Sequence, residues 1–117
     1  MTTIHLTEAK CEACEGGVPP LAPDVAAELR TQTPDWQIDA AGKVLYREYT
    51  LRSFAEALAL LNQAGAVAEA EGHHPNLHLT DYKHLRIELT THAIGGLSQN
   101  DFIVAAKLDA AVDQSGE

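Results

Sequence analysis

The 117-residue sequence has few basic residues, only two cysteines and no long uninterrupted apolar run. Eight basic residues stand against 17 acidic ones, and the net charge of −9 argues against direct binding of nucleic acid. Polar and acidic residues interrupt the most apolar stretch, residues 54–70, so no membrane span is predicted. The N-terminal residues lack a basic start and an apolar segment, which predicts no export signal. Because cysteine is scarce, the reducing cytoplasm is the expected location.

The residues that are present have the composition of one globular domain. Hydrophobic residues make up 45% and charged residues 21% of the chain, unlike the pattern of a disordered protein. The length permits a single core. Residues 1–22 are rich in Gly, Pro and Cys with little periodicity, so they are predicted to form an extended N-terminal arm. Residues 23–117 are predicted to form a single domain.

Three segments have the features of helices. Pro23 suits a first helical position, and residues 23–31 are predicted to form a short helix with Val25 and Leu29 facing inward. A capping box at Ser53 opens a longer helix that runs to about residue 71. Its inward face is predicted to comprise Phe54, Ala57, Leu58, Leu61 and Ala68. A second capping pattern at Ser98 opens the last helix.

Four segments have the features of strands. Residues 36–39 and 43–51 flank a short Ala-Ala-Gly segment, which predicts a β-hairpin. Residues 77–79 and 85–89 alternate leucine or isoleucine with polar residues, which predicts two half-buried strands. The resulting order is αββαββα. It predicts an α+β fold in which a four-stranded antiparallel sheet carries three helices packed on one face.

Five of the six histidines lie within 20 consecutive residues, namely His73, His74, His78, His84 and His92. Imidazole exchanges protons near neutral pH and also binds metal ions, so the cluster indicates acid–base chemistry or a metal site. His78 and His84 alternate outward from the strand leucines and are predicted to lie on the surface. His74 and His78 have the spacing of a helical zinc site, but Pro75 and the strand pattern argue against a helix. No metal is therefore predicted there.

The segment Glu69-Ala70-Glu71-Gly72-His73-His74-Pro75, followed by Tyr82, His92 and Asp101, resembles the signature of the pterin-4a-carbinolamine dehydratases. The segment 17–21 resembles the N-terminal arm of bacterial members, and Trp36 stands where they usually carry a tryptophan. The resemblance covers nearly the whole chain. Leu77, Gly72 and Asn100 depart from the residues that many relatives carry. The resemblance implies the αββαββα fold and a pterin pocket.

The activity implied by this resemblance is the removal of water from 4a-hydroxytetrahydropterin, without a metal or organic cofactor, in tetrahydrobiopterin recycling. The implied catalytic residues are His73, His74 and His92. We expect two of these imidazoles to transfer protons and His74 to hold the pterin. Glu69 and Asp101 would fix a histidine tautomer, and Asp101 is also placed to cap a helix. The expected substrate-binding residues are Pro75, Thr91, Ala93 and Ile94.

Two other functions stay open at the level of sequence. Some relatives are coactivators or assembly factors, which makes a non-catalytic partner protein an alternative, although the intact histidines favour catalysis. Cys11, Cys14 and His5 offer three zinc ligands, but no second pair of cysteines completes a zinc-ribbon site. We also expect a homodimer or homotetramer, joined through an exposed sheet edge over residues 43–51, which carry few charges.

Overall fold

The computed structural model of the chain describes residues 6–9, 11 and 19–114. Its elements, in chain order, are η1 (Leu6–Glu8), α1 (Pro23–Arg30), β1 (Gln37–Ile38), β2 (Leu45–Thr50), α2 (Phe54–Glu71), β3 (Asn76–Thr80), β4 (His84–Leu89), η2 (His92–Ile94) and α3 (Gln99–Gln114). The predicted order αββαββα is confirmed, with two short 3-10 helices added. None of the helices in these residues combines the length and the hydropathy that crossing a membrane requires.

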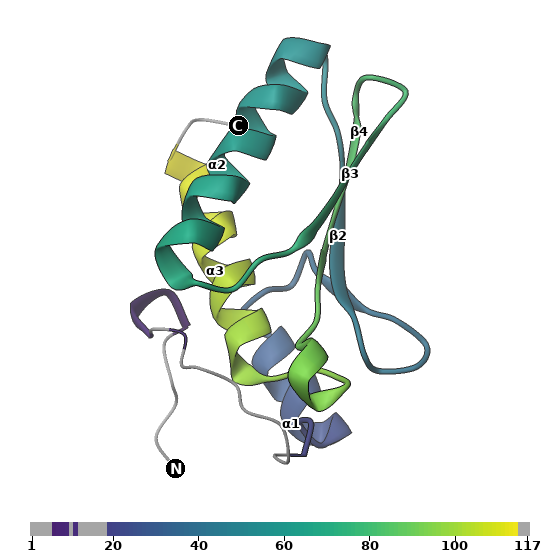
Figure 1. Cartoon of the computed structure of the whole chain (residues 1–117), viewed down its shortest axis with the longest axis vertical. Coiled ribbons are helices and arrows are strands. Elements are labelled where there is room, and N and C mark those ends of the chain that lie inside the picture. The colour runs from purple at the N-terminus through teal and green to yellow at the C-terminus, as the bar shows by residue number, and fades with distance from the viewer. Residues whose placement is uncertain (1–5, 10, 12–18, 115–117) are drawn as a thin grey trace.

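The four strands form one antiparallel sheet in the order β1-β2-β4-β3. Figure 1 shows the helices on one side of this sheet, whereas no described segment covers the other side. The predicted α+β fold, with helices packed on one face, is confirmed. On the open face His78 is exposed and His84 is half-buried.

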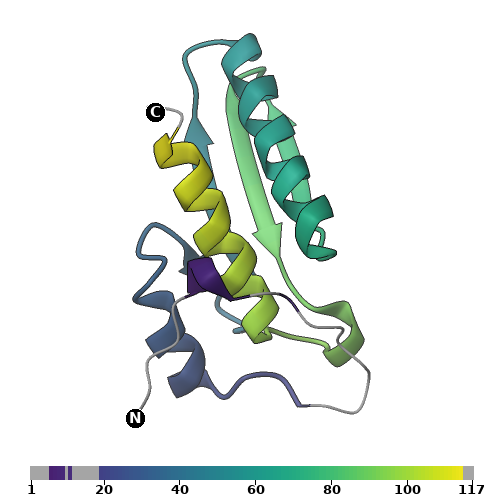
Figure 2. The same ribbon diagram turned by 90° about the vertical axis from the view of Figure 1, so that its left-hand side faces the viewer.

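Helix α3 lies at the centre of the core, and its residues 101–106 are all buried. It packs against α1, α2 and η1, and Figure 2 shows α2 and α3 beside each other over the sheet. Leu85, Ile87 and Leu89 of β4 supply the buried face of the sheet. Leu6 of η1 is only 1% exposed and belongs to the same core. Part of the segment 1–22 therefore packs against the domain.

A buried tryptophan ties α3 to the sheet. Trp36 is fully buried, and its Nε1–H donates a hydrogen bond to Asp109 Oδ1 at 2.9 Å. Arg47 of β2 donates to the same oxygen at 2.7 Å. Burial nevertheless raises the pKa of Asp109 above its ordinary value. These bonds join α3 to β2 and to the segment that precedes β1.

The buried faces of α1 and α2 match the prediction only in part, since Ala57 and Ala68 are buried as predicted and Leu29 packs against the core. In α2 the buried residues are Ala57, Leu60, Ala64 and Ala68. Phe54 and Leu58, both predicted to face inward, are 51% and 39% exposed. Three of the four buried residues are alanines, whose small side chains permit close packing against α3. In α1 the prediction for Val25 is also wrong, since it is 42% exposed and Ala26 is buried instead.

The sheet edge predicted over residues 43–51 is covered in part by β1. Strand β2 lies between β1 and β4, so it is not an outer strand of the sheet. Strand β1 comprises only two residues and pairs only with Leu45 and Tyr46. On that side of β2, the remaining residues 47–50 face no strand of the described chain. The predicted edge is therefore present over part of β2, and β3 forms the opposite edge.

Candidate active site

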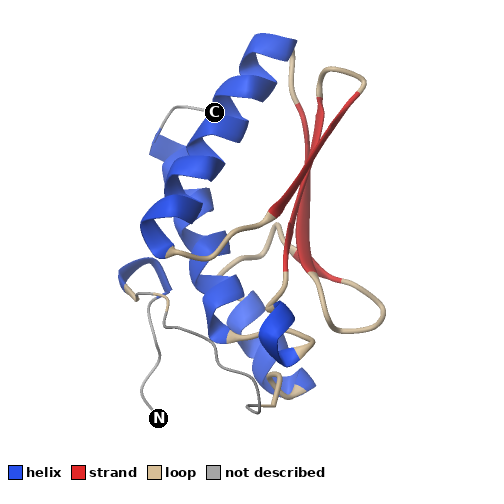
Figure 3. Ribbon diagram, in the orientation of Figure 1, coloured by secondary structure: helices blue, strands red, loops and turns tan. Residues whose placement is uncertain are grey.

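The histidine segments meet at one end of the β3–β4 hairpin. His73, His74 and Pro75 connect α2 to β3, and His92 begins η2 shortly after β4. Because β3 and β4 pair in antiparallel register, the start of β3 and the end of β4 lie at the same end of the sheet. Figure 3 shows both connecting segments at the end of the hairpin that lies away from its turn.

Gly72 directs the chain out of α2 towards this site. It adopts the left-handed conformation, with φ of 67°, and forms the C-cap of α2. A side chain at this position would be strained, which is why glycine suits it. The N–H of His73 then bonds to the carbonyl of Ala68 at 3.2 Å. This cap sets the direction in which the chain leaves the helix at His73.

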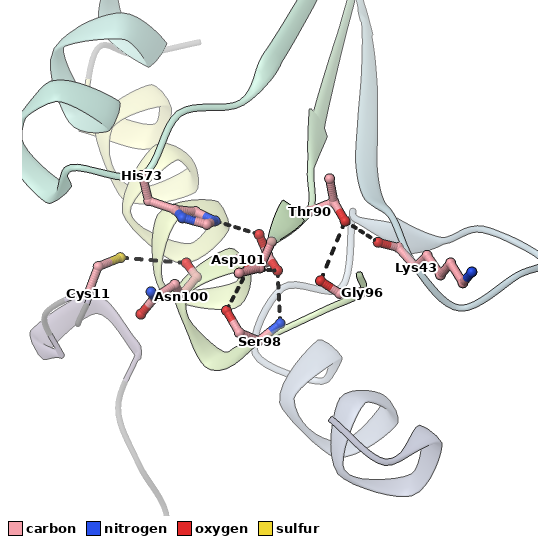
Figure 4. A network of polar contacts seen from close by, with 9 residues as sticks. Cys11, Lys43, His73, Thr90, Gly96, Ser98, Asn100 and Asp101 are labelled. Carbon is pink, nitrogen blue, oxygen red and sulfur yellow. Dashed lines mark hydrogen bonds and ion pairs between the residues drawn. The ribbon is translucent and has the colours of Figure 1, made fainter. Parts of the chain in front are cut away.

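The imidazole of His73 contacts the carboxylate of Asp101 in the first turn of α3. Its Nε2 lies 2.6 Å from Asp101 Oδ1 (Figure 4). The two side chains are 13% and 0% exposed. Asp101 is out of contact with water and His73 is nearly so, which leaves little water to compete for this contact. Two residues 28 positions apart are thereby joined beside the hairpin end.

The second oxygen of Asp101 has its own two donors. Oδ2 accepts a hydrogen bond from Thr91 Oγ1 at 2.9 Å and another from the N–H of Ser98 at 2.9 Å. The bond from Ser98 is the backward half of a capping box, because Ser98 immediately precedes α3. The hydroxyls of Ser98 and Thr91 are 2.7 Å apart. Asp101 thus caps α3 with one oxygen and binds His73 with the other.

His74 forms a separate and solvent-exposed pair. Its Nε2 lies 2.6 Å from Glu69 Oε1, and the two side chains are 60% and 79% exposed. An exposed ion pair adds little to stability, so this contact chiefly orients the imidazole. Glu69 belongs to the last turns of α2, where a negative charge opposes the helix dipole.

The remaining predicted site residues surround the start of η2 and the end of the α2–β3 connection. His92 and Ala93 are exposed, whereas Ile94 and Pro75 are half-buried. Within the described chain, the imidazole of His92 makes no hydrogen bond to His73 or His74. The structure therefore pairs each of these two histidines with a carboxylate and leaves the His92 side chain beside solvent.

A third histidine–carboxylate pair lies on the open face of the sheet. His78 Nε2 is 2.9 Å from Glu88 Oε1, and the side chains are 51% and 23% exposed. Arg86 donates to the other oxygen of Glu88 at 2.7 Å and holds the pKa of that carboxyl below its ordinary value. His78 therefore belongs to a polar network on the sheet surface, away from the hairpin end.

The possible metal ligands do not assemble in the described residues. No group of three or more histidines, cysteines and acids that could hold a metal ion occurs there. Cys14 and His5 lie outside the described residues. Burial, followed by the negative charge of Glu71, raises the pKa of the Cys11 thiol to about 12.

Sequence reasoning missed two structural features around the site. The hydroxyl of Ser98 reaches Thr91, although the capping pattern pointed only to the helix start. Glu71, two residues before His73, accepts hydrogen bonds from Lys107 Nζ at 2.6 Å and from the N–H of Cys11 at 3.0 Å. No periodicity or spacing links residues this far apart, so the sequence carries no signal for this junction.

Tyr82 of the family-like signature lies at the other end of the hairpin. It is 57% exposed and, like Asp81, has a positive φ, of 56° and 49° respectively. The two residues therefore lie in the three-residue turn, 81–83, between β3 and β4. The length of β3 separates this turn from the histidine segments, so Tyr82 of the same chain is outside the candidate site.

The fold and the site define a small α+β protein that gathers imidazoles and carboxylates at one end of its sheet. Imidazoles and carboxylates commonly act as the proton donors and acceptors of general acid–base catalysis. A family model described as "Pterin 4 alpha carbinolamine dehydratase" matches residues 19–111. The chain belongs to this family.

Relatives are similar over almost their full length. One from Halorhodospira halophila, named "Putative pterin-4-alpha-carbinolamine dehydratase", is 42% identical over 107 residues, covering 92% of this chain and 97% of the relative. Another of that name, from Dechloromonas aromatica, is 43% identical over 112 residues, covering 96% of this chain and 97% of the relative. The similarity therefore includes the histidine segments and both flanking helices.

Two solved structures share the fold. The crystal structure of a transcriptional coactivator/pterin dehydratase from Brucella melitensis matches with a TM-score of 0.72 and 25% identity, covering 79% of this chain and 97% of that chain. A pterin dehydratase-like protein, identified as a RuBisCO assembly factor in the alpha-carboxysome, matches with a TM-score of 0.55 and 23% identity. That second match covers 66% of this chain and 88% of the other.

Proposed function

We propose that this protein removes water from 4a-hydroxytetrahydropterin to give quinonoid dihydropterin, as a step in pterin recycling. Membership of the pterin 4 alpha carbinolamine dehydratase family supports the substrate class. The observation that carries the proposal is the buried contact of 2.6 Å between His73 and Asp101, placed at the hairpin end. A fixed imidazole–carboxylate pair suits general acid–base catalysis because its geometry is set before the substrate binds.

The reaction requires two proton movements. The C4a–O bond breaks as the hydroxyl receives a proton and leaves as water. N5 loses its proton, and its electrons form the C4a–N5 double bond. Each positioned proton transfer contributes about 10²–10⁴-fold to the rate. Imidazole can perform both transfers, because its ordinary pKa lies close to neutral pH.

We assign the two transfers to His73 and His92. Asp101 engages Nε2 of His73, so Nδ1 is the nitrogen that would exchange a proton with the substrate. His92 is exposed at the start of η2 and supplies the second imidazole. His74, oriented by Glu69, would hold the pterin and its hydroxyl.

The main chain around η2 and Pro75 would hold the pterin ring. Ala93 is exposed and Ile94 is half-buried, so both border solvent at the hairpin end. Thr91 is different, because its N–H donates to Gly96 and its hydroxyl donates to Asp101. Its carbonyl also accepts from Ile94. We therefore assign Thr91 to support of Asp101 rather than to direct contact with substrate.

The direct test mixes purified protein with freshly generated 4a-hydroxytetrahydropterin and follows the formation of quinonoid dihydropterin. We expect a rate well above the nonenzymatic one. Since side chains can perform both proton transfers, we expect activity to survive exhaustive treatment with a chelator. Loss of activity that zinc restores would overturn the imidazole mechanism, and a folded protein without turnover would overturn the proposed reaction.

A second candidate function is binding of a protein partner. The sheet face that no described helix covers favours it, as do the coactivator and assembly-factor roles stated for the two structural relatives. The assay above separates the two candidates. Turnover supports catalysis, whereas a folded and inactive wild-type protein supports a binding role without chemistry.

A further inference from the structure

Ser98, Thr91 and Asp101 form a series of hydrogen bonds that ends on the Asp101 carboxylate, which also contacts His73. Thr91 Oγ1 donates to Asp101 Oδ2, so its single proton is committed to the carboxylate. The contact of 2.7 Å between the hydroxyls of Ser98 and Thr91 must then have Ser98 as its donor. The N–H of Ser98 also donates to Asp101 Oδ2. Figure 4 shows His73, Asp101 and Ser98 converging at the first turn of α3.

The surroundings of Asp101 make each donor important. Asp101 is fully buried and Thr91 is 3% exposed. No lysine or arginine in the described chain forms an ion pair with Asp101, whose polar partners besides His73 are a hydroxyl and an N–H. A buried carboxylate needs such donors, because removing one leaves an oxygen without its bond and without water. The two donors on Oδ2 also fix the rotation of the carboxylate.

We propose that Thr91 and Ser98 are positioning residues for the dehydration proposed above, on which this inference rests. By occupying Oδ2 they direct Oδ1 at His73, so the ring carries its proton on Nε2 and presents Nδ1 to the substrate. Ser98 acts twice, through its N–H on Asp101 and through its hydroxyl on Thr91. Residues at the start of α3 thereby determine the tautomer of His73, which follows α2.

Matched substitutions separate this role from a general role in folding. Thr91→Val keeps the side-chain shape and removes the hydroxyl, while Thr91→Ser restores the hydroxyl. Ser98→Ala removes the hydroxyl and keeps the N–H donor. Thr90→Val is the control in the neighbouring position, because the hydroxyl of Thr90 donates to the carbonyl of Lys43 at 2.6 Å and not to Asp101. Circular dichroism and thermal unfolding establish that each variant is folded.

Two readouts are measured on these variants. Ring nitrogen chemical shifts from protein labelled with ¹⁵N-histidine report the His73 tautomer, at a pH where the imidazole is neutral, without any need for activity. Steady-state dehydration gives kcat and KM. We expect one His73 tautomer, protonated on Nε2, in the wild type, Thr91→Ser and Thr90→Val. In Thr91→Val and Ser98→Ala we expect a mixture of tautomers and a kcat about tenfold lower, with little change in KM.

The outcomes distinguish this inference from the proposed reaction. A wild-type His73 tautomer in folded Thr91→Val and Ser98→Ala would overturn the positioning role, whatever the activity. An inactive wild type would overturn the dehydration, and the tautomers would still show whether the two residues position His73. If Thr91→Val does not fold, Ser98→Ala and the recovery in Thr91→Ser decide the matter. An equal fall of kcat in Thr90→Val would also contradict the inference.

Discussion

Burial distinguishes the three histidine–carboxylate pairs of this chain. All three bring Nε2 within hydrogen-bond distance of a carboxylate oxygen. The side chains of His73 and Asp101 are only 13% and 0% exposed, whereas the imidazoles of His74 and His78 are 60% and 51% exposed. Water competes for the same donors and acceptors in an exposed pair, so its geometry is held weakly. We therefore expect His73 to be the imidazole whose tautomer the fold controls.

The exposed histidines provide the first prediction. His92→Ala removes the second proposed proton carrier, and we expect a fall in kcat of about 10²-fold or more. His74→Ala removes a proposed binding group, and we expect a smaller fall in kcat together with a higher KM. Both side chains are exposed, so neither substitution should change the thermal midpoint appreciably. Initial rates corrected for the nonenzymatic reaction provide the measurement, and near-wild-type kinetics in both variants would contradict these assignments.

At the residue scale, the sequence predicted which groups to examine but not their contacts. The His-His-Pro segment, His92 and Asp101 were chosen by resemblance to a family. The capping pattern independently predicted a structural role for Asp101, which the bond from Ser98 confirms. The involvement of Thr91 in holding Asp101 has no sequence signal, because it depends on how the segment after β4 meets α3. Such contacts are set by tertiary packing.

Three segments meet at Glu71, the last residue of α2. Its carboxylate accepts bonds from Lys107 of α3 and from the main chain of Cys11. The thiol of Cys11 in turn lies 3.7 Å from the carbonyl of Asn100, next to Asp101. Cys11 therefore contacts Glu71, which lies two residues before His73, and Asn100, which immediately precedes Asp101. The Lys107 hydrogen bond is the main reason that the pKa of Glu71 is lowered.

The second prediction follows from this pKa. Because the folded pKa of Glu71 lies below its ordinary value of 4.5, the Lys107 interaction stabilises the fold above that pH. The contribution is lost as the pH falls through the lower, folded value. We expect Lys107→Met to lower the free energy of unfolding at pH 7 by about 1.5–3 kcal/mol. The difference in the free energy of unfolding between the variant and the wild type should become smaller as acid protonates Glu71.

Urea unfolding at pH 7 and at successively lower pH measures this difference. The matched control is Arg52→Met, because the Arg52 side chain is 89% exposed and its pair with Glu56 spans 3.7 Å. That variant should stay within about 0.5 kcal/mol of the wild type. If the difference in unfolding free energy between Lys107→Met and the wild type does not change with pH, the stabilising interaction of Lys107 is not with the Glu71 carboxylate.

At the element scale, periodicity predicted the type and order of the helices and strands well. It failed in part for the buried face of α2, because the prediction gave more weight to large apolar residues than to alanines. The predicted Ala57 and Ala68 are buried, but Leu60 and Ala64 join them in place of the exposed Phe54 and Leu58. The prediction also made the strands of the first hairpin too long, since β1 has only two residues. Helix faces and strand ends depend on neighbouring elements that one segment does not reveal.

At the scale of the whole molecule, the sheet has edges along which no strand of the described chain lies. β3 forms one edge, and residues 47–50 of β2 have no described strand beside them on the other edge. Sheet edges of this kind are sites at which two copies of a chain can join. We therefore propose that the protein forms a homodimer or a homotetramer by pairing such an edge across a two-fold axis.

The third prediction is the mass in solution. Light scattering coupled to size-exclusion chromatography should give at least twice the monomer mass of 12.6 kDa at micromolar concentration. Four times that mass would indicate the tetramer. A mass near that of the monomer would contradict the self-association that we propose.

The most direct test of the whole account compares His73→Ala with His78→Ala. Each substitution removes an imidazole whose Nε2 contacts a carboxylate oxygen, at 2.6 Å for His73 and 2.9 Å for His78. Only His73 lies at the hairpin end, against the buried Asp101. We predict that His73→Ala lowers the kcat of dehydration by about 10²-fold or more, whereas His78→Ala keeps wild-type turnover. Equal turnover in the two folded variants would contradict the central claim that the buried imidazole performs the chemistry.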